Sequence, residues 1–220
     1  MKISVVRNIL EANDRIAQQN RDLFDESGLL VMNLMSSPGA GKTSLLEKSI
    51  STLKEDFKIG IIEGDIQSSQ DAERIAKTGV PVVQINTGSA CHLDANMIRD
   101  TFAEFSFKEL DLLVVENVGN LVCPAEFKVG EDFKVMILSV TEGDDKPAKY
   151  PLMFHESSVL LINKIDLLPY VDCSVEKIQE EALKINPDLT IFQISCKTGE
   201  GLDNWCNWVL QRVKANKTSH

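Results

Sequence analysis

The segment Ser36–Thr43, Ser-Ser-Pro-Gly-Ala-Gly-Lys-Thr, constrains the fold of this chain more than any other feature. An apolar run, Leu29–Met35, precedes it, and a helical pattern, Ser44–Ile50, follows it. This order predicts a strand, a tight glycine loop and a helix, the arrangement in which backbone N–H groups and a helix N-terminus bind phosphate. Ser36 stands where this motif usually has its first glycine, but the two glycines nearest the phosphates are kept.

This loop predicts a nucleotide-binding site of the P-loop type. Lys42 supplies a point charge to the phosphates, and the Thr43 hydroxyl is a ligand for Mg²⁺. The predicted phosphate-binding residues are Pro38, Gly39, Ala40, Gly41, Lys42, Thr43 and Ser44.

The rest of the chain predicts an α/β fold in which a mostly parallel sheet is covered by helices on both faces. The apolar runs are strand-length and continuous rather than alternating, which is typical of strands buried on both sides. Besides Leu29–Met35, the predicted strands are Lys58–Glu63, Val80–Ile85, Leu110–Val115, Lys134–Val140, Val159–Ile162 and Leu189–Ile194. Helical patterns near 70–78, 93–104, 174–185 and 202–214 supply the covering layers.

The predicted domains are an N-terminal helical extension, 1–27, and a P-loop GTPase domain, 28–216. Apolar residues spaced along 2–25 indicate one or two amphipathic helices, which either pack on the sheet or serve as a docking arm for a partner.

Composition and charge limit the classes of partner that this chain is expected to bind. The chain has 220 residues and a net charge of −10, which argues against a nucleic-acid or an anionic-membrane partner. No apolar run approaches the roughly 18 residues of a membrane span, and the N-terminus does not resemble a signal peptide, so we expect a cytoplasmic protein. The five cysteines are then expected to be thiols, metal ligands or core residues rather than a disulfide framework.

Asn163–Asp166, Asn-Lys-Ile-Asp, follows a predicted strand and favours guanine as the base. Asp166 can accept hydrogen bonds from the ring N–H and the exocyclic amine of guanine, whereas adenine presents the opposite pattern at that edge. Lys164 can cover the base and Asn163 can join neighbouring loops. Ser195, Cys196 and Lys197 follow the last predicted strand and can offer backbone N–H groups to the guanine carbonyl. A solvated surface turn is the alternative interpretation.

The Mg²⁺ ligands are expected at the carboxyl ends of strands. Besides Thr43, the predicted ligands are Asp65 and Glu116, and Asp71 is predicted to hold a metal-bound water or to orient the attacking one. For Asp65 and Asp71 the alternative is an ordinary solvated loop charge.

Cys91, His92 and Cys123 suggest a second metal site, because thiolate and imidazole are ligands for Zn²⁺ or Ni²⁺. Three ligands leave a position open for water or for a second subunit. Pro124 predicts an extended backbone at Cys123, in a loop rather than a helix. The alternative is that these cysteines pack in the core.

Several motifs together resemble the HypB family of GTPases that serve nickel insertion into [NiFe]-hydrogenase. They are Ser37–Thr43, Gly64–Ile66, Asn86–Gly88, Cys91–Ala95, Glu116–Ala125, Thr141–Asp144 and Asn163–Asp166. The resemblance implies a GTPase of the SIMIBI class that forms a homodimer when GTP is bound, with Cys91, His92 and Cys123 of each subunit at the interface. It also implies a HypA-like nickel-delivery protein and the hydrogenase large subunit as partners. The first 90 residues contain no Cys and no His, so we expect neither the N-terminal nickel motif nor the histidine-rich tract of some family members.

The expected activity is GTP hydrolysis, and we expect it to be slow because no residue obviously serves as the water-orienting glutamine. The expected cofactors are GTP/GDP, Mg²⁺ and Ni²⁺ or Zn²⁺. The predicted catalytic residues are Lys42, Asp71, Glu116 and Lys149, the last reaching the partner's nucleotide in a dimer. The alternatives are a metal-binding scaffold with a structural nucleotide, a urease-type nickel accessory GTPase and an ATP-driven carrier; Asn163–Asp166 argues against the last.

Overall fold

The computed structural model of the protein describes residues 9–66 and 68–219. Its centre is a seven-stranded sheet with the order β3-β2-β4-β1-β5-β6-β7, in which every pair of neighbouring strands is parallel. The strands are β1 (Leu30–Ser36), β2 (Ile59–Asp65), β3 (Val82–Asn86), β4 (Leu112–Glu116), β5 (Phe133–Ser139), β6 (Val159–Asn163) and β7 (Thr190–Gln193). All seven predicted strands are confirmed, with ends that differ by a few residues.

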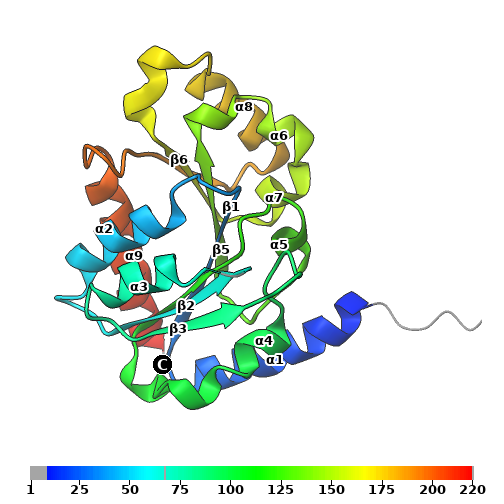
Figure 1. Ribbon diagram of the computed structural model, residues 1–220, viewed down its shortest axis with the longest axis vertical. Coiled ribbons are helices and arrows are strands. Elements are labelled where there is room, and N and C mark those ends of the chain that lie inside the picture. The colour runs from blue at the N-terminus through cyan, green and yellow to red at the C-terminus, as the bar shows by residue number, and fades with distance from the viewer. Residues whose placement is uncertain (1–8, 67, 220) are drawn as a thin grey trace, which may run out of the picture.

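Helices cover both faces of the sheet, as Figure 1 shows. On one face lie α2 (Lys42–Leu53), α3 (Gln70–Ala76) and α9 (Leu202–Ser219). On the other lie α5 (Cys123–Glu126), α6 (Lys146–Lys149), α7 (Pro151–Glu156) and α8 (Val175–Ile185), with α1 (Ile9–Glu26) and α4 (Ala95–Arg99) side by side below them. The protein therefore has the doubly covered sheet of P-loop nucleotide-binding proteins.

The continuous hydrophobicity of the strands is explained by alternate side chains that enter cores on opposite faces. In β1, Met32 and Leu34 pack with α2 and α9, around Trp205, whereas Val31 packs on the other face with Phe24 of α1. A third cluster around Phe154 joins α7 and α8 to β5 and β6. In the described part of the chain, no helix is both long and apolar enough to cross a bilayer.

Some helices differ from their predicted extents. The N-terminal pattern forms one helix, α1, over the described residues, and residues 1–8 lie outside them. The helix predicted near 93–104 ends at Arg99 and is followed by two 3₁₀ turns, Phe102–Glu104 and Phe107–Glu109. The turns direct the rings of Phe102 and Phe107 against Phe24, so tertiary packing of aromatic side chains outweighs continuation of the helix.

Strand order places the functional loops together. β4 lies between β2 and β1, and β5 lies on the other side of β1. In a parallel sheet the carboxyl ends of neighbouring strands meet at one edge, where α/β proteins bind their ligands. The loops that follow β1, β2 and β4 are therefore adjacent, although 80 residues separate Ser36 from Glu116 in sequence.

Candidate nucleotide and metal site

The loop between β1 and α2 has the backbone shape that phosphate binding requires. Gly41, at the start of α2, has φ 108°, and a Cβ atom there would lie 2.5 Å from Asn163 Nδ2. A side chain is therefore excluded both by conformation and by space. The Lys42 ammonium donates to Ser36 Oγ at 3.1 Å, so the serine that replaces the usual first glycine holds the lysine that is predicted to bind phosphate.

The residues predicted to recognise the base lie beside this loop. Asn163 Nδ2 donates to Ala40 O at 2.9 Å, and Lys164 Nζ donates to Gly39 O at 2.7 Å. Asp166 accepts a hydrogen bond from Ser195 Oγ at 2.5 Å, and Cys196 N donates to Asn163 Oδ1 at 3.3 Å. A cavity of about 310 Å³ opens between them, lined by Gly41, Ser44, Asn163, Lys164, Asp166, Leu167, Cys196 and Lys197. The structure thus brings all the predicted base-binding residues to one place.

Three carboxylates from different elements converge next to the P-loop helix. Glu63 of β2, Asp71 of α3 and Glu116 of β4 place oxygen atoms within 4.8 Å of one another. Thr43 Oγ1 donates to Glu116 Oε1 at 2.9 Å. Among the described residues, Glu63 Oε2 and Glu116 Oε2 are buried without a hydrogen-bond partner. Buried carboxylate oxygens without partners are costly, and a hard divalent cation is one ligand that would satisfy them.

Electrostatics in this cluster favour protonation when no cation is bound. Burial, followed by the charge of Glu116, raises the pKa of Glu63 to about 8. Burial likewise raises the pKa of Glu116 to about 7, although Lys42 and Thr43 oppose the shift. The side chain of Glu63 is 3% exposed and that of Glu116 2% exposed, which accounts for the size of both effects. Without a bound cation, both carboxyl groups therefore hold their protons more tightly than an exposed glutamate does.

The predicted Mg²⁺ ligands are brought together only in part. Thr43, Asp71 and Glu116 meet, but Asp65 is absent from the carboxylate cluster of the described residues. Its carboxylate accepts hydrogen bonds from Ile66 N at 2.7 Å and from Ser68 N at 2.8 Å, so it shapes the loop after β2. Glu63, which the sequence analysis did not select, takes that place. A carboxylate inside an otherwise apolar strand was the signal for it.

Two further residues of the site were also missed. Arg74 of α3 pairs with Asp71 at 3.0 Å and with Glu47 of α2 at 2.6 Å, which joins the helix that carries Asp71 to the P-loop helix. Glu142 accepts a hydrogen bond from Ser37 Oγ in the P-loop and from Ser139 N at 2.8 Å at the end of β5. The contacts of Arg74 with Glu47 and of Glu142 with Ser37 join segments far apart in sequence, so local spacing does not predict them. The capping box of Ser139 and Glu142 is, in contrast, a local pattern.

The second cluster contains Cys91, His92 and Cys123. Cys91 Sγ lies 3.0 Å from Cys123 Sγ and 3.8 Å from His92 Nδ1. All three side chains are half-buried, and their ligand atoms lie within 4.8 Å of one another. The His92 ring packs on Phe127, with 3.8 Å between the ring centroids. Burial lowers the pKa of His92, which keeps the imidazole in the neutral form that binds metal.

The backbone at Cys123 differs from the prediction of an extended loop, which was wrong. Cys123 begins the helical turn α5, and Pro124 occupies its second position. Proline is tolerated in the first turn of a helix because its missing N–H has no intrahelical partner there. The helical turn, rather than an extended strand, directs the Cys123 thiol toward Cys91.

The two clusters share the segment that runs from Glu116 to Cys123. A Cβ atom at Gly119 would lie 2.9 Å from the backbone of Pro38, so this segment touches the P-loop directly. Asn117 Oδ1 accepts from Leu93 N at 3.0 Å, and Asn120 Nδ2 donates to Cys91 O at 3.3 Å. One short stretch of chain therefore contacts the phosphate-binding loop, the loop of Cys91 and the carboxylate cluster.

Lys149, the remaining predicted catalytic residue, lies away from these clusters in α6. Its ammonium pairs with Asp145 Oδ2 at 2.5 Å, and its side chain is 59% exposed. Within one chain it does not meet the predicted nucleotide site, which leaves its expected role to a second subunit.

Comparison with known proteins assigns the family. The model of the CobW/HypB/UreG nucleotide-binding domain matches residues 30–193. The hydrogenase maturation factor HypB of Azotobacter chroococcum is 50% identical over 207 residues, which cover 94% of this chain and 68% of that protein. The hydrogenase/urease maturation factor HypB of Helicobacter pylori is 40% identical, over 99% of this chain and 90% of that protein. A crystal structure of HypB from Helicobacter pylori in complex with nickel superposes with a TM-score of 0.88 at 39% identity, covering 93% of this chain and 96% of that one. The motifs, the parallel sheet and these similarities together show that the chain belongs to the HypB family of hydrogenase maturation factors, within the CobW/HypB/UreG nucleotide-binding proteins.

Proposed function

We propose that the protein is a slow GTPase that controls a Ni²⁺ or Zn²⁺ site formed by Cys91, His92 and Cys123, in the service of nickel insertion. The observation that carries this proposal is the shared segment Glu116–Cys123, which contacts the P-loop through Gly119 and ends at a thiol of the Cys91–His92–Cys123 cluster. Nickel is the cargo that the relatives' function as hydrogenase maturation factors implies, and the Helicobacter pylori homologue was crystallised with nickel.

Guanine specificity in this proposal rests on Asp166. Its position at the edge of the 310 Å³ cavity, with Ser195 as its hydrogen-bond donor, leaves it suited to accept from the base. Phosphate release from GTP, with ATP as the comparison, tests the activity. We expect slow turnover of GTP and little competition by ATP. Nickel transfer without any GTP turnover would instead favour a scaffold with a structural nucleotide.

Mg²⁺ would be held by the oxygen atoms of four residues: Thr43, Glu63, Asp71 and Glu116. The ion would neutralise charge on the β- and γ-phosphates. Hydrolysis then depends on what the chain itself supplies. The P-loop backbone and Lys42 bind and orient the phosphates, and Asp71, which Arg74 holds at 3.0 Å, is placed to orient a water. Lys149 is proposed to reach the nucleotide of a second subunit in a GTP-dependent homodimer, with a HypA-like protein and the hydrogenase large subunit as further partners.

The raised pKa values of Glu63 and Glu116 predict that Mg²⁺ stabilises the GDP complex more at pH 8.5 than at pH 6. Both folded-state pKa values, about 8 and about 7, exceed the ordinary glutamate pKa of 4.5. The stability that protonation contributes is therefore fully present below about pH 4.5 and is lost as pH rises through 7 and 8. Mg²⁺ replaces those protons, so the rise in Tm that it causes should grow over this interval. Calorimetric scans with GDP, with and without Mg²⁺, measure it.

The matched control is Glu73→Gln, which neutralises an acidic residue of α3 outside the carboxylate cluster. It should leave the pH dependence unchanged, whereas Glu63→Gln should flatten it. An equal Mg²⁺ effect at both pH values in the unaltered protein would contradict the assignment of the ion to these carboxylates.

Gly119→Ala is expected to weaken binding of a GTP analogue at least about tenfold. The added Cβ would lie 2.9 Å from Pro38 N and Cα, both backbone atoms, so the P-loop itself must move. Misplacing a preorganised binding loop costs on the order of 1–3 kcal/mol. Gly79→Ala is the control, because a Cβ there meets nothing within 4 Å and only the positive φ of 85° is strained. Titration with a fluorescent GTP analogue compares them; equal affinity in both variants would remove the proposed contact between P-loop and shared segment.

A further inference from the structure

The N-terminal helix α1 contacts both segments that carry the proposed metal ligands. One is the segment that follows Cys91 and His92 and begins α4 at Ala95. The other is the loop that follows Cys123 and continues through Lys128 and Val129 to β5. These two segments are more than 30 residues apart in sequence, and α1 precedes both of them. Cys91 lies four residues before Ala95, and Cys123 lies five residues before Lys128.

Two buried asparagines on α1 make the bridge. Asn13 Oδ1 accepts from Ala95 N at 2.9 Å, and Asn13 Nδ2 donates to Lys128 O at 2.8 Å. Two turns of helix further on this face, Asn20 Nδ2 donates to Ala95 O at 2.8 Å and to Val129 O at 3.2 Å. Each amide therefore joins the first segment to the second. Asn13 does so with its oxygen and its nitrogen, and Asn20 does so with the two protons of its nitrogen.

The asparagine side chains are held rigidly in this arrangement. Asn20 is fully buried and Asn13 is 6% exposed. Arg99 of α4 donates to Asn20 Oδ1 at 3.2 Å, which fixes the orientation of that amide. In a buried setting, loss of one partner leaves a backbone N–H or carbonyl unpaired, so the segments cannot separate or slide without a cost in free energy.

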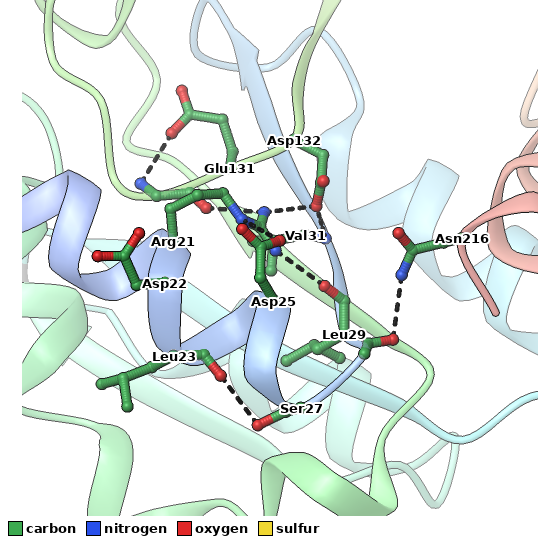
Figure 2. A network of polar contacts seen from close by, with 12 residues as sticks. Arg21, Asp22, Leu23, Asp25, Ser27, Leu29, Val31, Glu131, Asp132 and Asn216 are labelled. Carbon is green, nitrogen blue, oxygen red and sulfur yellow. Dashed lines mark hydrogen bonds and ion pairs between the residues drawn. The ribbon is translucent and has the colours of Figure 1, made fainter. Parts of the chain in front are cut away.

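Arg21 extends the same contact to the start of β5. Figure 2 shows its guanidinium reaching from α1 to Asp132 and to the Leu29 carbonyl. It also donates to Gly130 O at 3.0 Å, and Asp132 accepts from Val31 N at 2.7 Å. The loop after Cys123 is thereby attached to α1 at three successive points, Lys128, Val129 and Gly130.

We propose that Asn13 and Asn20 are positioning residues for the metal site: they set the separation of the Cys91–His92 segment from the Cys123 segment and so tune metal affinity. The inference rests on the proposed metal site. It assigns to α1 a function in metal binding, in place of a docking arm. Groups that hydrogen-bond directly to metal ligands typically change the affinity of a site about 10- to 100-fold when they are removed. Asn13 and Asn20 act through the backbone beside the ligands, so we expect an effect at the low end of that range.

The test is Ni²⁺ binding to the full chain carrying Asn13→Leu, which removes both hydrogen bonds at nearly constant volume. We expect Ni²⁺ affinity to fall about tenfold or more and the thiolate-to-nickel charge-transfer bands to shift, with GDP affinity within about twofold of the unaltered protein. Asn13→Asp keeps the acceptor for Ala95 N but sets a carboxylate oxygen against Lys128 O, so a loss of Ni²⁺ affinity is expected here too. Gln18→Leu is the control, because this exposed residue of α1 donates to Asp22 on the same helix.

The outcomes separate the two proposals. If no charge-transfer bands appear in the unaltered protein with Ni²⁺, the proposed metal site itself is contradicted. If the unaltered protein shows these charge-transfer bands, and both Asn13 variants keep its Ni²⁺ affinity and spectrum, the metal site stands and the proposed positioning by Asn13 is overturned. Loss of GDP binding in both variants would assign Asn13 to folding and would overturn it as well.

Discussion

Replacing Cys123 with serine is expected to lower Ni²⁺ affinity by at least about 100-fold while GDP affinity stays unchanged. A serine hydroxyl remains protonated near neutral pH and is a poor ligand for Ni²⁺ or Zn²⁺, whereas the cysteine thiolate is a strong one. Cys123 Sγ lies 3.0 Å from Cys91 Sγ, so its loss leaves one thiolate and His92. Removal of a direct ligand exceeds the 10- to 100-fold effect of residues behind the ligands.

Cys173→Ser is the matched control for this variant. Cys173 is another half-buried free cysteine, and it belongs to neither metal cluster of the described residues. Competition titrations against a chromogenic chelator should find its affinity for Ni²⁺ equal to that of the unaltered protein. If Cys123→Ser and Cys173→Ser bind Ni²⁺ equally well, the cluster is not the metal site.

Asp166→Asn is expected to reverse the base preference, with GTP affinity reduced about 100-fold or more and xanthosine triphosphate bound better than GTP. The carboxylate accepts from two N–H groups of guanine, and charged hydrogen bonds of this kind are each worth about 1.5–3 kcal/mol. The N–H₂ group of asparagine is a donor, and so is the exocyclic amine of guanine, so the two do not form a hydrogen bond. Xanthine carries a carbonyl at that position, which accepts from the asparagine amide. Ser195 can still donate to the asparagine oxygen, so the loop should keep its structure.

Asp172→Asn, a nearby exposed aspartate, is the control and should bind GTP normally. Equilibrium titrations with the two triphosphates decide the result. Retained preference for GTP in Asp166→Asn would show that Asp166 does not contact the base.

Those parts of the candidate site that lie in contiguous segments could be predicted from the sequence. The P-loop and Asn163–Asp166 carry their chemistry at fixed spacing, and the strands that precede them are visible as apolar runs. Residues whose function depends on packing were missed. Glu63 lies in a strand and meets Glu116 only because β2 neighbours β4, and Asp65, two residues later, turns back to its own loop.

The same limit applies to the metal loops. Pro124 suggested an extended backbone, yet proline at the second position of α5 is compatible with a helical turn, and neighbouring residues alone do not distinguish the two. Asn13 and Asn20 read as ordinary polar positions of an amphipathic helix. Their hydrogen bonds to Ala95 and Val129 arise from tertiary contacts that span 75 residues or more.

The central claim is that the nucleotide and the metal share one segment of chain, so that each senses the other. Ni²⁺ titration of the same protein with GDP and with a non-hydrolysable GTP analogue, followed by light scattering on each sample, tests it most directly. The account predicts that affinity and stoichiometry for Ni²⁺ differ between the two forms, with dimer mass in the triphosphate form. Equal affinity and equal stoichiometry in both forms would contradict it.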